Sequence, residues 1–251
     1  MKVMTFNIKD GGTGREQVIL EVFRIIQPEL ILLQEVTDPS LVREWAASLN
    51  MEFVVAKGHS FRHVAIMSYF PIVSWTSHTP LQYFSRDYLA ATIEYAPAHS
   101  LRVFGIHLIA QPFVAYEWLR LLEIRSILRH AAQDSDLPCL LGGDFNAVSP
   151  IDRPIIKNMP LRIKMMMILQ ANRFPHAVIA TTQYAQFFDC FRLLHTEPGF
   201  TLPPPAPSIR FDYLFANSHL KPSLQRCFVV REPQAVEYAS DHYPLVADFA
   251  L

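Results

Sequence analysis

The sequence predicts an α/β fold in which two β-sheets pack face to face and helices cover their outer surfaces. Three observations favour this class. Strand-like apolar runs and amphipathic helices alternate along the chain, and five strand-like runs follow one another near its middle without a long helix between them. The chain has 251 residues, of which 51% are hydrophobic, so it can bury one large core. We therefore expect residues 1–251 to form a single domain.

The N-terminal elements are a strand and an amphipathic helix. Residues 3–6 (VMTF) predict the strand, and the glycine-containing segment 10–14 (DGGTG) separates it from the helix. Thr13 and Glu16 have the spacing of a capping box at the helix start, and Pro28 ends the helix. The expected apolar face consists of Val18, Ile19, Val22, Phe23, Ile25 and Ile26.

A second buried strand and a series of further strands follow. Residues 30–36 (LILLQEV) predict the strand, and residues 41–49 a short helix whose Leu41, Trp45 and Leu49 recur every four positions. The absence of long helices in the next part of the chain indicates antiparallel pairing. The strands expected there are residues 52–56, 63–69, 72–78, 89–95 and 101–108.

The second half of the chain begins with a long helix over residues 115–132. Its buried stripe is expected to consist of Leu121, Ile124, Leu128 and Ala131. An apolar strand and the turn that ends it occupy residues 137–146, and a proline-rich loop occupies residues 202–208. The closing strands are expected at residues 210–216, 226–232 and 244–250.

The cysteines and the N-terminal residues bear on the compartment. Cys139, Cys190 and Cys227 are widely spaced and odd in number, which favours core thiols over a disulfide framework or a zinc site. The first residues have too short an apolar run for a signal peptide, so we expect cytoplasmic residence. No run approaches the roughly 20 apolar residues that span a bilayer, and we expect no stable membrane insertion.

The charge balance is close to neutral, with 22 basic and 23 acidic residues. This balance argues against binding to nucleic acid mainly through a strong positive field. If Glu35, Asp144, Asp212 and Asp241 belong to a metal site, the other residues carry a net charge of +3. A modestly basic surface is then compatible with the sequence.

Polar residues recur where the predicted strands begin or end. Taken singly, each has an ordinary explanation as a turn former, a cap, a surface acid or a core histidine with satisfied nitrogens. One hypothesis accounts for all of them together, namely strand ends that converge on a divalent cation and a phosphate. Hard oxygen ligands of this kind suit magnesium. These residues are Asn7, Glu35, His107, Asp144, Asn146, Asp212, Asp241 and His242.

Six motifs, in this order, resemble those of the endonuclease/exonuclease/phosphatase superfamily, the deoxyribonuclease-like metal-dependent phosphoesterases. They are TFNI, LLQEV, GIHL, GGDFNAVSP, RFDYLF and SDHYPLVADF, and they extend from Thr5 to Phe249. The combination of QE, GDFN and SDH is specific, whereas QEV alone is weak. The resemblance implies a four-layer α/β sandwich of two mostly antiparallel sheets with helices outside.

The resemblance also implies a set of metal ligands. Glu35 is similar to the principal ligand of Mg²⁺ or Mn²⁺ in the family, with Asn7 and Asp241 as helpers. Some nucleases of the superfamily carry an acid two residues after the asparagine of the first strand. Here Lys9 occupies that place and Asp10 follows it, so the motif for a second metal ligand in this loop is absent.

The remaining roles implied by the resemblance concern water and phosphate. Asp144 resembles the residue that orients or deprotonates the attacking water, and Asn146 the amide that holds this water and a phosphate oxygen. His242 and His107 resemble the pair that contacts the scissile phosphate, with Asp212 orienting His242. Together these residues imply in-line displacement at a phosphodiester.

The segment of residues 151–174 matches none of the motifs. It has two interpretations: a helix with methionine core contacts and a solvated basic face, or a lid that brings cations or apolar surface to a substrate. Its basic and methionine residues are Arg153, Lys157, Arg162, Lys164, Arg173, Met159, Met165, Met166 and Met167, against the single acid Asp152.

We expect the chain to be a metal-dependent phosphodiester hydrolase whose partner is a phosphodiester substrate. Nucleic acid is the leading substrate, because most motifs match nuclease members and the charge outside the site is slightly positive. The alternatives are a phosphodiesterase or phosphatase of lipids or small molecules, similar to a sphingomyelinase, and a catalytically silent binding module. We expect the protein to act as a monomer.

Overall fold

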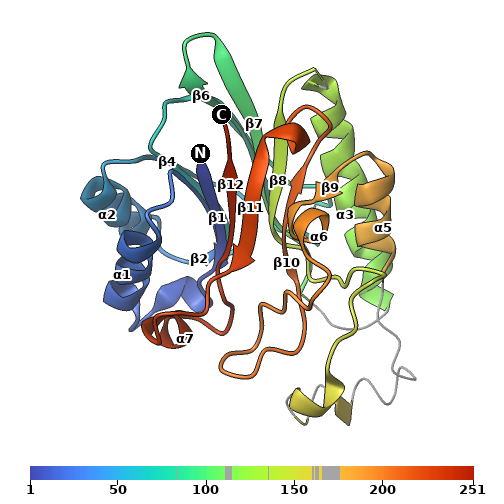
Figure 1. The fold of residues 1–251 in the computed structure, drawn as a ribbon. Coiled ribbons are helices and arrows are strands. Elements are labelled where there is room, and N and C mark those ends of the chain that lie inside the picture. The colour runs from blue at the N-terminus through green and yellow to red at the C-terminus, as the bar shows by residue number, and fades with distance from the viewer. Residues whose placement is uncertain (83, 111–114, 135, 160, 162–163, 166–175) are drawn as a thin grey trace.

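The computed structural model has two six-stranded sheets packed face to face, with helices on their outer surfaces (Figure 1). This architecture confirms the predicted α/β sandwich. The structure describes residues 1–251 apart from residues 83, 111–114, 135, 160, 162–163 and 166–175.

The first sheet, called sheet A, has the strand order β11-β12-β1-β2-β4-β3. β1 and β2 pair in parallel, and all other neighbours pair antiparallel. Each of these strands was predicted from its apolar run. Their bounds are Lys2–Asn7 (β1), Leu30–Val36 (β2), Glu52–Val55 (β3), His63–Ser68 (β4), Leu224–Val229 (β11) and Leu245–Phe249 (β12).

The second sheet, called sheet B, has the order β5-β6-β7-β8-β10-β9. Here β7 and β8 are parallel, and the other neighbours are antiparallel. Sequence patterns predicted every strand except β9, whose two residues are too few to form a pattern. The bounds are Ile72–His78 (β5), Tyr88–Ala96 (β6), His99–His107 (β7), Cys139–Asp144 (β8), Phe188–Asp189 (β9) and Asp212–Ala216 (β10).

Helices cover the outer face of each sheet (Figure 1). Sheet A carries α1 (Glu16–Ile26), α2 (Pro39–Leu49) and the short α7 (Ala235–Ala239), and sheet B carries α3 (Ala115–Ala131) and α5 (Ala177–Tyr184). None of the helices in the described residues is both long and apolar enough to cross a membrane. Further helical segments among the described residues are α6 (Cys190–Leu194) and the 3-10 turns Asp10–Gly12, Ala132–Asp134, Ile156–Asn158 and Lys221–Ser223.

Three apolar layers hold the sandwich together: one between the sheets and one under each set of helices. In β1, Val3 faces the layer between the sheets, whereas Met4 and Phe6 face the helices of sheet A. Strands buried on both faces need apolar residues at successive positions, which explains the continuous runs in the sequence. Cys139, Cys190 and Cys227 are all buried in the core, as predicted.

Two details predicted for α1 are wrong. The helix begins at Glu16 with Arg15 as its N-cap and no side-chain cap. The Thr13 hydroxyl donates to the carbonyl of Asp10, and the Glu16 carboxylate accepts from the amide of Gly14. The glycine turn, with positive φ at each of its glycines, displaces the helix start past Thr13, so no capping box forms. Ile25, expected on the buried face, is 45% exposed, while Leu20 is buried instead.

Only part of the segment 151–174 falls within the described residues. Met159 is buried against Val148 and Ile209, as the core interpretation predicts, whereas Leu161 and Met165 are exposed. The segment is therefore neither wholly buried nor wholly solvated. Outside the described residues lie Arg162, Arg173, Met166 and Met167.

Candidate active site

The strand pairing explains why the predicted polar residues meet at one edge of the sandwich. Parallel strands place their carboxyl ends together, so β1 and β2 end near each other and so do β7 and β8. The antiparallel partners β12 and β10 begin at these same ends. In sheet B, Asp144 pairs in register with both His107 and Asp212. Side chains from both sheets can therefore surround one point.

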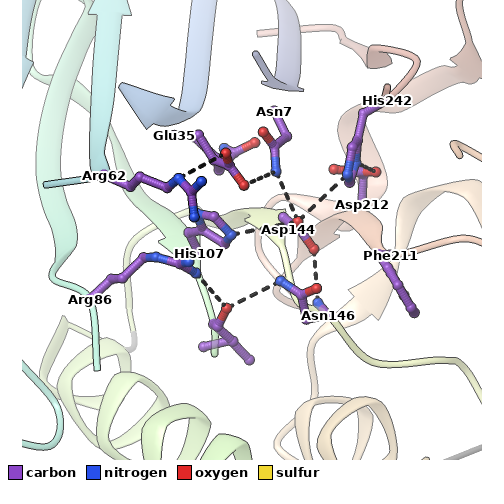
Figure 2. A network of polar contacts seen from close by, with 12 residues as sticks. Asn7, Glu35, Arg62, Arg86, His107, Asp144, Asn146, Phe211, Asp212 and His242 are labelled. Carbon is purple, nitrogen blue, oxygen red and sulfur yellow. Dashed lines mark hydrogen bonds and ion pairs between the residues drawn. The ribbon is translucent and has the colours of Figure 1, made fainter. Parts of the chain in front are cut away.

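Asp144 lies at the centre of the resulting network (Figure 2). Its Oδ2 accepts a hydrogen bond of 3.0 Å from Nδ2 of Asn7, and its Oδ1 accepts one of 2.9 Å from the backbone amide of Asn146. Burial, reinforced by the nearby carboxylate of Asp212, raises the pKa of Asp144 to about 7. A carboxyl group with this pKa can exchange protons near neutral pH.

Asp212 and His242 form a buried pair. Nδ1 of His242 lies 2.8 Å from Oδ2 of Asp212, while its Nε2 is directed toward Asp144 at 4.0 Å (Figure 2). Burial alone lowers the pKa of His242, but the charge and the hydrogen bond of Asp212 outweigh burial and raise it to about 10. The imidazole is therefore positively charged at neutral pH, which suits contact with an anion.

His107 is completely buried beside Asp144. Its Nε2 lies 3.7 Å from Oδ2 of Asp144, and neither ring nitrogen has a hydrogen-bond partner among the described residues. Burial, together with the positive charge of Arg86, lowers the pKa of His107 well below its ordinary value. The interpretation of His107 as a core histidine with satisfied nitrogens is therefore wrong. A buried, unpartnered imidazole and the equally unpartnered Oδ1 of Asp212 indicate places where a ligand contributes hydrogen bonds.

Glu35 reaches the site because β2 is irregular at this point. The register of β2 against β4 shifts between Leu33 and Val36, and Glu35 has a φ of 62°. Such a bulge redirects a side chain that regular pairing would place elsewhere. The Glu35 carboxylate accepts a 2.9 Å bond from the amide of Asp10 and lies 3.5 Å from Nδ2 of Asn7. Asn7 thus connects Glu35 with Asp144.

Asp241 lies next to the network but has other partners. Its carboxylate contacts Nζ of Lys9 at 3.2 Å and the Ser240 hydroxyl at 3.5 Å, and its side chain is 43% exposed. The Ser240 hydroxyl in turn donates to the backbone carbonyl of Asn7 at 2.6 Å. Of the three predicted metal ligands, Glu35 and Asn7 therefore contact each other, while Asp241 is tied to Lys9.

The turn that carries Asp144 and Asn146 depends on two unusual backbone conformations. Gly143 has a φ of 149°, and a Cβ built there would lie 1.8 Å from the carbonyl oxygen of Ile106. Only glycine fits this position between the parallel strands. Asn146 has a φ of 47°, and its Nδ2 donates to the carbonyl of Leu108 at 3.2 Å.

A buried ion network supports the loop that follows this turn. Arg210, which is fully buried, donates to Asp152 at 2.9 Å and to Asp189 at 2.6 Å, and Arg192 also pairs with Asp152. Asp152 follows the GGDFNAVSP motif, and Arg210 precedes Asp212 by two residues. The network therefore joins the two chain segments that present Asp144 and Asp212.

Two arginines at the site were not identified from the sequence. Nε of Arg62 lies 3.3 Å from the Glu35 carboxylate, and the same guanidinium contacts Asp10. Arg86 donates to the carbonyl of Leu108, the acceptor that it shares with Asn146 (Figure 2). Burial lowers the pKa of Arg86, and the carboxylates of Glu35 and Asp144 oppose this effect. Both arginines precede predicted strands, and nothing in their local pattern sets them apart from surface residues.

The chemistry of the donors fits a divalent cation. Glu35 and Asp144 supply carboxylate oxygens, the ligands preferred by hard cations such as Mg²⁺ and Mn²⁺. Asn7 adds an amide whose nitrogen contacts both carboxylates and whose oxygen accepts from the backbone amide of Lys9. Asp144, Asp212 and His242 also offer three ligand atoms within 4.8 Å of one another, so this acidic cluster could bind a metal. Around these donors, Arg62, Arg86 and His242 supply positive charge.

Comparisons with known proteins identify the family of the chain. The model of the Endonuclease/Exonuclease/phosphatase family matches residues 4–242. The chain belongs to the endonuclease/exonuclease/phosphatase family. Members of this family are hydrolases that act on phosphoesters and generally depend on divalent metals. A comparison with curated proteins finds no significant match.

Solved structures of this fold superimpose over the full chain. An AP endonuclease from Archaeoglobus fulgidus is 16% identical with a TM-score of 0.76, and each chain is covered to 100%. A 3'-5' exonuclease (NExo) from Neisseria meningitidis is 17% identical with a TM-score of 0.77, again with 100% of both chains covered. The human nocturnin catalytic domain is 20% identical with a TM-score of 0.69, covering 100% of this chain and 93% of that one. At these identities the likeness establishes the fold.

Proposed function

We propose that the protein is a magnesium- or manganese-dependent phosphodiester hydrolase, with residues 1–251 acting as one domain and nucleic acid as its substrate. The observation that carries this proposal is the meeting of Glu35, Asn7 and Asp144 with the Asp212–His242 pair. A carboxylate, a cationic imidazole and potential metal ligands around one point are what hydrolysis of an anionic diester requires.

Glu35 and Asn7 are the proposed metal ligands, with Asp241 as a third once it leaves Lys9. When bound, the divalent cation offsets negative charge on the phosphate. Asp144 takes a proton from the attacking water, which its pKa of about 7 permits. The side-chain amide of Asn146 orients this water and a phosphate oxygen.

The two histidines are proposed to contact the scissile phosphate. His242 is positively charged, and Asp212 fixes the orientation of its ring by accepting a hydrogen bond from Nδ1–H. His107 is neutral and can donate one hydrogen bond to a phosphate oxygen from a nitrogen that has no hydrogen-bond partner in the described part of the chain. Both contacts stabilise the charge that builds up as the fifth oxygen approaches phosphorus.

A phosphodiesterase acting on lipids is the second candidate. The exposed apolar side chains of Leu161 and Met165 favour it, because they lie in the basic segment that follows the catalytic turn. Nucleic acid is preferred because solved structures of similar fold include an AP endonuclease and a 3'-5' exonuclease. The arginines Arg62 and Arg86 suit either kind of phosphodiester.

The test of the proposal uses bis-p-nitrophenyl phosphate with and without EDTA, followed by a panel of natural substrates. The panel contains plasmid DNA, abasic DNA, single-stranded RNA, sphingomyelin and small diesters, each with the magnesium-loaded protein. We expect turnover that EDTA abolishes and added Mg²⁺ or Mn²⁺ restores. Absence of metal-dependent turnover on every substrate and at every pH would contradict the proposal and favour a binding module. Hydrolysis of sphingomyelin alone would favour the second candidate.

A further inference from the structure

A pocket of about 490 Å³ lies on the Arg86 side of the active site. Arg86 belongs to both places, because it lines the pocket and also shares the carbonyl of Leu108 with Asn146. The volume lies within the roughly 300–1,000 Å³ typical of small-molecule sites. Neither the sequence motifs nor the proposed catalytic steps use this pocket.

We propose that the pocket holds an unpaired nucleobase next to the scissile phosphate, with Phe61 and Phe84 as its stacking surfaces. This inference rests on the proposed function and narrows its substrate to nucleic acid with an unpaired nucleotide at the cleavage position. Such a nucleotide occurs in a single strand, at a frayed end or in a bulge.

The first support is the exposure of two aromatic side chains within one pocket. Phe61 is 70% exposed and Phe84 is 73% exposed, and both line the pocket together with Tyr116. Exposed apolar groups gathered in a hollow indicate a binding site more strongly than single ones elsewhere. Aromatic side chains beside a cationic groove are the usual means of binding unpaired bases, since every base has a π-face.

The second support is the placement of positive charge. The guanidinium of Arg62 lies 4.9 Å from the ring of Phe61, and Arg86 follows Phe84 by two residues. None of the described lining residues carries a carboxylate. Arg62 is already paired with Glu35 and Asp10, so the positive charge offered to a ligand in the pocket is that of Arg86. Such a ligand therefore has its apolar part near the two phenylalanines and its negative charge near Arg86. A base joined to its phosphate has this layout.

The third support is the polarity of the remaining wall, which favours a base over an acyl chain. Ser60, Thr79 and Ser85 supply hydroxyl oxygens, each of which already donates its proton within the protein, and His59 supplies an imidazole. The N–H groups of a base edge can donate to the lone pairs that these oxygens keep, whereas an acyl chain offers them no hydrogen bond. The chemistry of the wall therefore selects a planar, polar-edged group.

The test compares matched oligonucleotides that carry either a base or an abasic residue at the nucleotide beside the cleaved bond. The variants are Phe61→Ala, Phe84→Ala and their combination, with Phe61→Trp as the conservative replacement. Tyr184→Ala is the control, because Tyr184 is an exposed aromatic residue outside the pocket. We expect each alanine to lower kcat/KM for the base-bearing substrate by about 10- to 100-fold and to leave the abasic substrate unchanged. Phe61→Trp should retain turnover.

A second measurement separates this inference from the proposed function. In an Asp144→Asn background, binding of a short single strand containing 2-aminopurine is followed by its fluorescence, which stacking quenches. Quenching that is lost with Phe61→Ala and Phe84→Ala supports the pocket even if no substrate is hydrolysed. Equal loss of turnover on base-bearing and abasic substrates would overturn it while leaving the hydrolase intact. If Phe61→Ala and Phe84→Ala lost binding to phosphatidylcholine vesicles but bound the oligonucleotide unchanged, the assignment of the pocket to a nucleobase would also be overturned.

Discussion

At the scale of single residues, the site depends on neighbouring groups that shift one another's protonation. Burial, reinforced by Asp212, raises the pKa of Asp144, whereas the charge and hydrogen bond of Asp212 raise the pKa of His242 against the effect of burial. For Asp144 the change favours the neutral acid, and for His242 it favours the charged imidazolium. A base that titrates near neutrality and a fixed cation thus lie beside one buried carboxylate.

Substitutions at these residues should separate metal binding from turnover. We expect Glu35→Ala chiefly to weaken metal binding, measured by titration calorimetry with Mn²⁺. Asp144→Asn and His242→Ala should largely keep metal binding and lower kcat by roughly 10²- to 10⁴-fold each, because they remove a proton acceptor and a charge contact. If Asp144→Asn kept nearly full activity, the acceptor of the water proton would lie elsewhere, with Asp212 next in line.

At the scale of elements, the position of the site follows from where strands end. The motif residues could be singled out because they stand near the beginning or end of apolar runs, which is a local signal. Arg62 and Arg86 were not predictable, because tertiary contacts alone bring them to Glu35 and Leu108. Short elements such as α6 and α7 escaped prediction for a related reason, since five residues form too little of a period to recognise.

Gly143 allows a test of the turn that presents Asp144. We expect Gly143→Ala to destabilise the fold by at least ~2 kcal/mol and to abolish activity, because the new Cβ collides with backbone. Gly14→Ala is the matched control: its φ is also positive, 75°, but no atom lies within 4 Å of the added Cβ. Urea unfolding measures both. Equal losses in the two variants would show that φ alone, without the collision, sets the cost.

Helix α3 contains a buried acid whose titration should govern how stability changes between pH 4.5 and about 8. Burial raises the pKa of Glu123 to about 8, and its carboxylate accepts a 3.0 Å bond from the amide of Ile109. Between pH 4.5 and about 8 the folded protein therefore retains a proton that the unfolded chain has released. By linkage, the free energy of unfolding decreases as pH rises through this window and is fully retained only below it.

We accordingly expect Glu123→Gln to raise Tm by several degrees above pH 8 and to lose this advantage as pH falls toward 4.5. Glutamine can still accept the bond from Ile109, so the packing is preserved. Thermal unfolding across the pH range gives the measurement, with the exposed Glu21→Gln on α1 as the control. A Tm gain that did not vary with pH would contradict the assignment.

At the scale of the whole molecule, the net charge is −1, so attraction to a polyanion must come from local cations. If nucleic acid is the substrate, kcat/KM for an oligonucleotide should fall as KCl rises, with a log–log slope of about −0.7 for each phosphate neutralised on a single strand. Turnover of bis-p-nitrophenyl phosphate, which has one charge, should vary little. A salt response equally weak for both substrates would favour a small diester over nucleic acid.

The order of strands in sheet A also constrains how the chain folds during its synthesis. β1 pairs on one side with β2, which follows soon after it, and on the other side with β12, so that the amine of Met1 bonds to Phe249, 248 positions away. All of sheet B is synthesised between these partners. A nascent chain must therefore keep one edge of β1 unpaired until β12 has been made. Such distant pairing implies slow folding and a period of vulnerability to aggregation. His242 is made just before β12, so under the proposed function hydrolysis begins only once the sandwich has closed.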